Sequence, residues 1–141
     1  MKRVLVATDG SEAAGRAAQV AKRDDAQLLI VNIVGGYGLP DGVFSHIIRT
    51  EQASVKEMLE SLSAETLKKA HDRARASGAP SIQLESRAGD VAETLIEIAK
   101  EKAVEAVVVG KRGAGPLELL LLGSVSRKLV NLAPLPVIVV P

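Results

Sequence analysis

Four short runs of aliphatic residues are the feature of this 141-residue chain that most restricts its fold. The longest, Leu28–Val34, is apolar at almost every position, which is typical of a strand covered on both faces in a parallel sheet. A fifth segment, Ser81–Arg87, alternates between apolar and polar residues, so we expect it nearer the sheet edge. The other three predicted strands cover Arg3–Thr8, Ala106–Val109 and Val137–Val140.

Segments with helical spacing lie between these strands. Apolar residues recur at three- and four-residue steps from roughly Ser45 to Ser77, which predicts one long amphipathic helix. An alanine-rich stretch near the start predicts another helix, with Ser11 or Asp9 as its N-cap. The four predicted helices cover Ser11 to about Arg23, roughly Ser45–Ser77, a segment capped by Asp90, and Ser124 to about Leu132.

Five strands that alternate with four helices indicate an α/β fold. We expect a single-domain, doubly wound, five-stranded parallel sheet over residues 1–141, with right-handed crossovers and strand order 3-2-1-4-5. In open sheets of this kind, ligands bind beyond the carboxyl ends of the strands, where the strand order reverses. The residues that follow the first and fourth strands are therefore the ones to examine for a binding site.

Composition excludes several classes of function. With 18 Lys and Arg against 17 Asp and Glu, the net charge of +1 argues against a nucleic-acid binder driven by charge. The chain has no cysteine, and its only histidines, His46 and His71, are isolated, which leaves little for a zinc site. No apolar run is long enough for a membrane span, and the apolar start is too short for a signal peptide. We therefore expect a cytoplasmic protein that interacts with neither nucleic acid nor membrane.

Two strand ends carry residues suited to a phosphate ligand. Thr8-Asp9-Gly10-Ser11 follows the first strand, and a glycine-rich loop from Gly110 to Ser126 follows the fourth. Glycines let backbone N–H groups approach an anion, and a helix that begins at Ser124 would point its positive end at the same place. The loop is neither a Walker A motif nor a dinucleotide fingerprint. In the alternative interpretation, Gly110 only ends a strand, Gly123 is a hinge and Ser124 is an ordinary N-cap.

The spacing of these residues resembles a known signature. Gly110, Gly113 and Gly123-Ser124, separated by two and nine residues and followed by Val125-Ser126, resemble the ATP-binding signature of the universal stress protein family. The opening Val4–Glu12, the Gly89-Asp90 turn and the closing Ala133–Val140 are also similar to that family, so the resemblance extends over the whole chain. Lys111 departs from the pattern, because many members carry a small hydroxyl residue there.

The resemblance implies a role for each matching residue. The loop glycines with Ser124 and Val125 would hold phosphates and ribose, Ser126 would donate to a phosphate oxygen, and the Ile33 main chain would contact adenine. Asp9 would lie against the nucleoside as a ribose or magnesium ligand, or it is simply an N-cap or turn former. With almost no aromatic residues, aliphatic groups such as Ala7, Ile33 and Val109 would surround the adenine. The expected binding residues are Ala7, Thr8, Asp9, Ile33, Val109, Gly110, Arg112, Gly113, Gly123, Ser124, Val125 and Ser126, with Asp9 as the metal ligand.

The expected function is an ATP-binding stress-response or signalling module that hydrolyses ATP slowly or not at all. AMP and ADP are alternative ligands, with or without magnesium. None of Glu118, His46 and His71 is well placed as a general base. Two alternatives stay open: an ATPase or phosphoryl or adenylyl transferase that uses the same pocket, and an empty pocket in a protein whose role is association. We also expect a homodimer through the apolar strand Val137–Val140, and an unknown protein partner.

Overall fold

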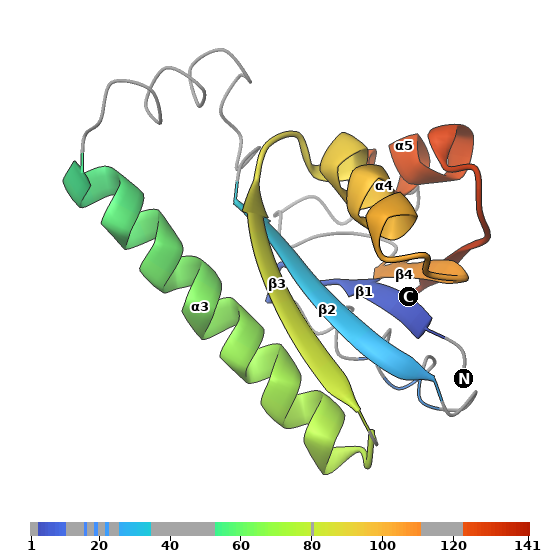
Figure 1. Cartoon of the computed structure of the whole chain (residues 1–141), viewed down its shortest axis with the longest axis horizontal. Helices are drawn as coiled ribbons and strands as arrows, with labels where there is room; N and C mark the ends of the chain where they lie inside the picture. The colour runs from blue at the N-terminus through green and yellow to red at the C-terminus, as the bar shows by residue number, and fades with distance from the viewer. Residues whose placement is uncertain are drawn as a thin grey trace.

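The computed structural model contains one five-stranded, entirely parallel sheet (Figure 1). It describes residues 3–10, 16, 19, 22, 26–34, 53–79, 81–110 and 123–141. The sheet order is β3-β2-β1-β4-β5, so the predicted order is confirmed. The strands are β1 (Arg3–Ala7), β2 (Gln27–Val34), β3 (Ile82–Ala88), β4 (Ala106–Gly110) and β5 (Val137–Val140).

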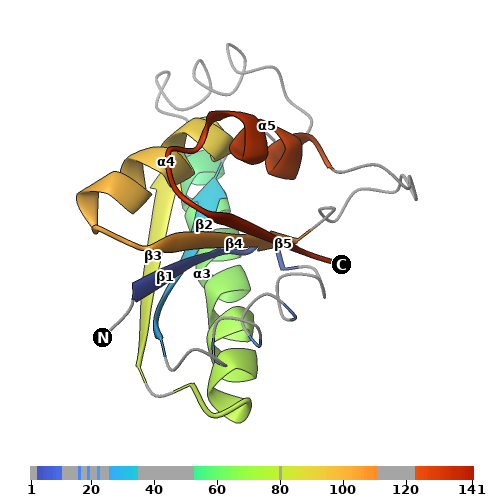
Figure 2. The same ribbon diagram turned by 90° about the vertical axis from the view of Figure 1, so that its right-hand side faces the viewer.

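Helices cover both faces of the sheet. The long helix α3 (Ala53–Ala76) lies on one face, and α4 (Val91–Glu101) and α5 (Ser124–Leu132) lie on the other (Figure 2). The described residues thus contain three complete helices where we predicted four. The predicted first helix falls mostly outside the described residues, and Arg16, Gln19 and Lys22 within it are helical. The predicted beginning of the long helix, residues 45–52, also lies outside them.

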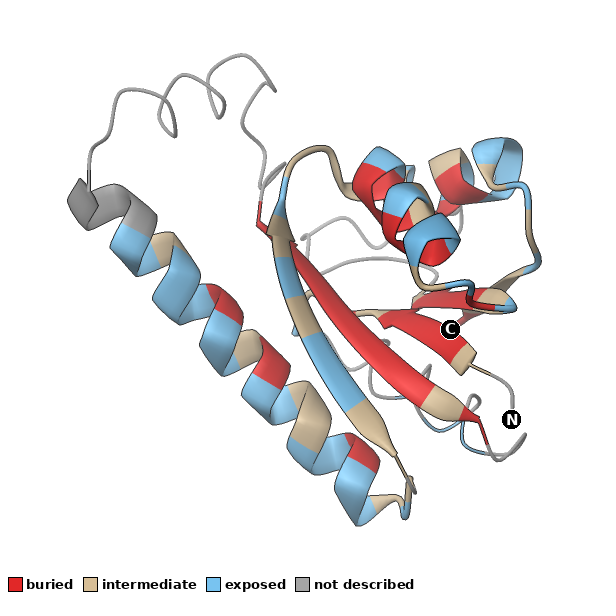
Figure 3. Cartoon of the chain, viewed as in Figure 1, coloured by how far each residue is buried: buried red, intermediate tan, exposed pale blue. Residues whose placement is uncertain are grey.

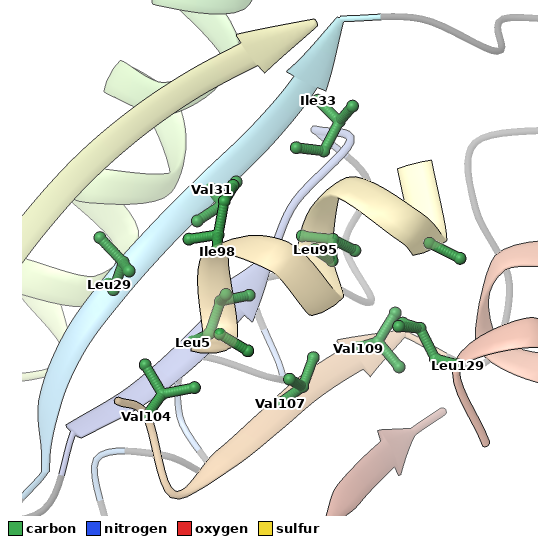
Figure 4. Packing of buried hydrophobic residues seen from close by; sticks show 12 residues of the cluster. Leu5, Leu29, Val31, Ile33, Leu95, Ile98, Val104, Val107, Val109 and Leu129 are labelled. Atoms are coloured by element: carbon green, nitrogen blue, oxygen red, sulfur yellow. The ribbon is translucent and has the colours of Figure 1, made fainter. Parts of the chain in front are cut away.

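Alternate residues of each strand enter two separate cores, because side chains in a strand point to opposite faces. The inner strands β1 and β2 are almost wholly buried, whereas the edge strand β3 is half-exposed (Figure 3). The α3-side core contains Val4, Val6, Ala26, Leu28, Ile30, Leu67, Ala74, Val108 and Val140. The α4-side core contains Leu5, Leu29, Val31, Ile33, Ala92, Leu95, Ile98, Ala99, Val104, Val107, Val109 and Leu129 (Figure 4). Continuous apolar runs in the sequence therefore reflect burial on both faces.

The two edges of the sheet differ in charge. On the β3 edge, the Arg87 guanidinium donates to both carboxylate oxygens of Glu101, at 3.1 and 2.9 Å, and lies 2.9 Å from Glu85. The hydrogen bond from Arg87 lowers the pKa of the Glu101 carboxyl. Charged side chains on an edge strand discourage pairing with another sheet. The β5 edge, Val137-Ile138-Val139-Val140, carries no charged residue.

Asp90 joins the beginning of α4 to α5. Its Oδ2 accepts from the backbone N–H of Glu93 at 3.0 Å, as the predicted N-cap should, and also from Nζ of Lys128 at 3.2 Å. The pKa of the Asp90 carboxyl falls below its ordinary value of 3.8, chiefly because of the Glu93 hydrogen bond. No helix within the described residues is long and apolar enough to cross a bilayer.

Replacement of this cap gives a first prediction. Asp90→Ala should lower the free energy of unfolding by about 1 kcal/mol near neutral pH, because the N-terminus of α4 loses its capping acceptor. Since the folded pKa is lowered, the stabilisation is complete above pH 3.8 and is lost as the pH falls through the folded pKa. Denaturant unfolding of both proteins across the acid range measures this. As a control, Asp72→Ala on the exposed face of α3 should change stability by less than about 0.5 kcal/mol; equal losses in both variants would contradict the prediction.

Candidate functional site

The ends of β1 and β4 are neighbours at the carboxyl edge of the sheet. The two strands pair in parallel, with Val6 opposite Val108, and the chain then leaves β1 as Thr8–Gly10 and β4 at Gly110. The order reverses here, since β1 connects to β2 on one side while β4 lies on its other side. This is the place where open parallel sheets bind ligands.

The turn after β1 is held by its own polar groups. Thr8 is buried, and its backbone N–H continues the ladder by donating to the Val31 carbonyl at 2.9 Å. Its hydroxyl Oγ1 accepts from the backbone N–H of Gly10 at 3.2 Å. Gly10 has a φ of +88°, a left-handed conformation that favours glycine. Asp9, between them, is half-buried.

The backbone of Ile33 points past the end of β1. In a central strand of a parallel sheet, the backbone N–H and C=O of one residue bond to the strand on one side, and those of the next residue bond to the strand on the other side. The carbonyl of Val31 accepts from the backbone N–H of Thr8, the residue that follows β1. The N–H and C=O of Ile33, two residues later, therefore also face the β1 side of β2. The β1–β2 register ends at Ala7 opposite Val31. Ile33 thus offers backbone groups at the predicted adenine position.

The expected aliphatic surroundings also lie together. Ile33 and Val109 are 5% and 6% exposed members of the α4-side core, and half-buried Ala7 and Val125 pack against that same cluster. Figure 4 shows Ile33, on β2, and Val109, on β4, both on the side of the sheet that α4 covers. The structure thus brings residues from β1, β2, β4 and the first turn of α5 to one apolar cluster.

The N-cap residue of α5 supplies no side-chain hydrogen bond to the helix. Gly123 occupies the N-cap position and Ser124 is the first, exposed helical residue, so the alternative in which Ser124 is the N-cap is wrong. Ser126 is 1% exposed, and its hydroxyl donates to the Gly123 carbonyl at 3.0 Å. The first backbone N–H groups of a helix have no partner within it. Here no side chain of the N-cap takes one of them.

Several predicted residues cannot be placed. Arg112, Gly113 and Lys111 lie in the loop 111–122, outside the described residues, as do His46 and Glu118. His71 is half-buried on α3, with Nδ1 3.4 Å from Oδ1 of Asp72. Within the described ranges, no group of three His, Cys, Asp or Glu residues could hold a metal ion.

Sequence reasoning missed one polar residue at this edge. Asn32 is 1% exposed, and its Nδ2 donates to the carbonyl of Thr8 at 2.9 Å. Its Oδ1 accepts from the hydroxyl of Ser63, on α3, at 2.7 Å. The available signal was an amide side chain within an otherwise apolar strand, where a polar group is costly unless it is hydrogen-bonded.

The strand order and this edge define a doubly wound α/β domain, a class whose members bind ligands where the strand order reverses. The chain belongs to the universal stress protein family, whose sequence profile matches residues 1–141, and the recognition made from the motifs is confirmed. A universal stress protein of Methanocaldococcus jannaschii is 33% identical over 147 residues, which cover 99% of this chain and 81% of that protein.

Two solved structures show the same fold. Universal stress protein UspA from Lactobacillus plantarum superimposes with a TM-score of 0.77 at 24% identity, over 99% of this chain and 97% of that chain. A universal stress protein in complex with cAMP superimposes with a TM-score of 0.66 at 27% identity, over 99% of this chain and 96% of that chain.

The hydroxyl of Thr8 can be tested alone. Thr8→Val keeps the shape of the side chain but removes the acceptor for the Gly10 N–H, so we expect a loss of about 1 kcal/mol in the free energy of unfolding. Denaturant titration measures the loss. A variant as stable as the parent protein would show that this hydrogen bond does not hold the turn.

Proposed function

We propose that this protein binds ATP, or AMP or ADP, at the carboxyl edge between β1 and β4 and acts as a nucleotide-dependent stress-response or signalling module. The observation that carries the proposal is the N-terminus of α5, which has Gly123 as its N-cap and follows β4, the neighbour of β1 where the strand order reverses. Backbone N–H groups at a helix N-terminus and the positive end of the helix dipole favour a phosphate there. The 27% identical family member in complex with cAMP supports an adenine nucleotide as the ligand class.

The nucleoside would lie over the ends of β1, β2 and β4. The Ile33 backbone would contact the adenine, among the aliphatic groups of Ala7, Ile33 and Val109. Thr8 and Asp9 would lie against the ribose, and Asp9 would also hold magnesium if the ion accompanies the nucleotide. The phosphates would contact Gly110, Arg112, Gly113, Gly123, Ser124, Val125 and Ser126.

Ser126 would need to turn its hydroxyl to reach a phosphate. Its proton is directed to the Gly123 carbonyl, which is in the N-cap residue of the same helix. Rotation about its χ1 angle between staggered wells would redirect the donor. Binding would then exchange an internal hydrogen bond for a charge-assisted one, which is the stronger kind.

Slow or absent hydrolysis is part of the proposal. A general base must lie within hydrogen-bond reach of the attacking water. His71 is on α3 beside Asp72, and the half-buried Asp9 is the one described carboxylate in the turn at the switch point. Rapid phosphate release from ATP that Asp9→Ala abolishes would instead establish an ATPase, whereas ADP formed without free phosphate, or released pyrophosphate, would establish a phosphoryl or an adenylyl transferase.

Calorimetric titration with ATP, ADP and AMP, with and without magnesium, tests the site. Gly123→Asp should weaken ATP binding at least about tenfold, because it places a negative charge and a side chain at the N-cap of α5. Asn131→Asp, a matched control, adds the same charge to the exposed last turn of α5 and should leave the affinity unchanged within about twofold. Equal affinity in both variants would count against the site.

We further propose a homodimer that forms along β5, in the cytoplasm, with a protein partner still to be identified and with no role for nucleic acid or membrane. β5 lies at one edge of the sheet, and its first three residues are half-buried and apolar. An uncharged edge strand can pair with a second copy about a two-fold axis.

Charge at this edge gives the corresponding prediction. Val139→Lys should convert a dimer to a monomer or aggregate, because a lysine would be buried at each copy of the interface. Gln83→Lys, on the exposed opposite edge strand β3, is the matched control and should stay dimeric. Light scattering measures the mass of each protein. A Val139→Lys protein with an unchanged dimer mass would refute the β5 interface.

A further inference from the structure

A chain of hydrogen bonds links β3 and α3 to the turn after β1, and its two central residues are buried. It begins at Ser86 on β3, whose Oγ lies 2.6 Å from Oγ of Ser63 on α3. Ser63 lies 2.7 Å from Oδ1 of Asn32, and Asn32 lies 2.9 Å from the carbonyl oxygen of Thr8. Ser63 and Asn32 are 2% and 1% exposed. Four segments distant in the sequence therefore meet in one polar line within the α3-side layer.

The direction of this chain follows from its donors. The hydroxyl of Ser63 has one proton, which it donates to Oδ1 of Asn32. Ser86 must then donate to Ser63, since the two oxygens lie 2.6 Å apart. The amide of Asn32 donates onward to the Thr8 carbonyl. Every donor points toward β1, and hydrogen bonds arranged in this way strengthen one another.

The carbonyl of Thr8 is the point where β1 leaves the sheet. In a regular parallel ladder, this carbonyl would accept from the backbone N–H of Ile33. The β1–β2 register instead ends at Ala7, and the Asn32 side chain takes the carbonyl. The substitution of a side-chain donor for a ladder donor lets the chain turn at Asp9 and keeps the Ile33 backbone facing the ligand edge.

An apolar residue at this position would need no hydrogen-bond partner. Asn32 shares its face of β2 with Leu28 and Ile30, which are fully buried. An amide in such surroundings costs free energy unless both its ends are hydrogen-bonded. Asn32 has both ends bonded, one to the turn that would hold the nucleoside and one to α3.

We propose that Asn32 is a positioning residue for the nucleotide site. It fixes the Thr8 carbonyl, and with it the Thr8–Gly10 turn, and through Ser63 it ties that turn to α3. The inference rests on the proposed function, because the effect of the link is read through nucleotide affinity. Thr66 of α3 also lies beside this turn, with its Cγ2 3.6 Å from where a Cβ on Gly10 would be. A shift of α3 and a change at the ligand edge are thereby coupled.

The test removes the Nδ2 donor of Asn32. Asn32→Asp keeps the acceptor for Ser63 but puts a second acceptor against the Thr8 carbonyl. We expect ATP binding, measured by calorimetry near neutral pH, to weaken at least about tenfold. The carbonyl ¹³C resonance of Thr8 should move upfield in the ligand-free protein, because it loses its donor. This resonance reports the link itself and does not follow global stability.

A second variant keeps the test decisive if Asn32→Asp fails to fold. Ser63→Ala removes the donor that orients the amide and should weaken ATP binding about threefold, with a smaller shift of the same resonance. The control is Val4→Ala at the opposite end of β1, buried in the α3-side core, which should lower the melting temperature but leave the affinity for ATP unchanged.

The outcomes separate this inference from the proposed function. If the wild-type protein binds no ATP, ADP or AMP, the proposed function is overturned and the inference falls with it. If the wild type binds but folded Asn32→Asp or Ser63→Ala binds within about twofold of it, only the inference is overturned. The inference is supported if both variants bind ATP more weakly while Val4→Ala keeps the wild-type affinity.

Discussion

The pairing of β1 with both β2 and β4 is the constraint on which the rest of the structure depends. A strand with two parallel neighbours must have its hydrogen-bonding groups used on both sides and its side chains buried on both faces. The strand order reverses at β1, which places the carboxyl ends of β1 and β4 side by side at one edge of the sheet. The turn at Thr8–Gly10 is placed at that edge by topology, before any of its side chains is considered.

Burial on both faces explains the polar features as well. In the two cores, nearly every strand side chain is aliphatic, so the few polar groups present must be hydrogen-bonded where they are. Ser63 donates to the Asn32 side chain, which donates to the Thr8 carbonyl, and the Ser126 hydroxyl donates to the Gly123 carbonyl. Asp90 serves the N-terminus of α4 and receives Lys128 from α5. Asp90 and Ser126 make their contacts at the beginnings of α4 and α5, and Asn32 makes its contact with the turn that follows β1.

Strand positions could be predicted because strands that are buried on both faces consist of continuous runs of apolar residues. Ala106–Gly110 and Val137–Val140 are runs of β-branched residues that few other structures would accommodate, and both are strands. The Asp90 cap was equally clear, because it depends on residues adjacent in the chain. The helix predicted from Ser124 to about Leu132 is confirmed as α5, whereas the alternative with Ser124 as N-cap is wrong, because the path of the backbone makes Gly123 the N-cap although serine is the better capping residue by preference. The role of Asn32 was missed for a related reason: its partners are 24 and 31 residues away along the chain.

What the sequence determined by itself was the set of elements and the family, because periodicity, turn residues and the spacing of Gly110, Gly113 and Gly123 are local properties of the chain. Only the tertiary structure decided which polar groups of distant segments meet: the Asn32 amide with the Thr8 carbonyl, Ser63 with Ser86, and Lys128 with Asp90. The physical reason is that a hydrogen bond requires a donor and an acceptor about 3 Å apart. No pattern along a single chain specifies that distance between residues that folding alone brings together.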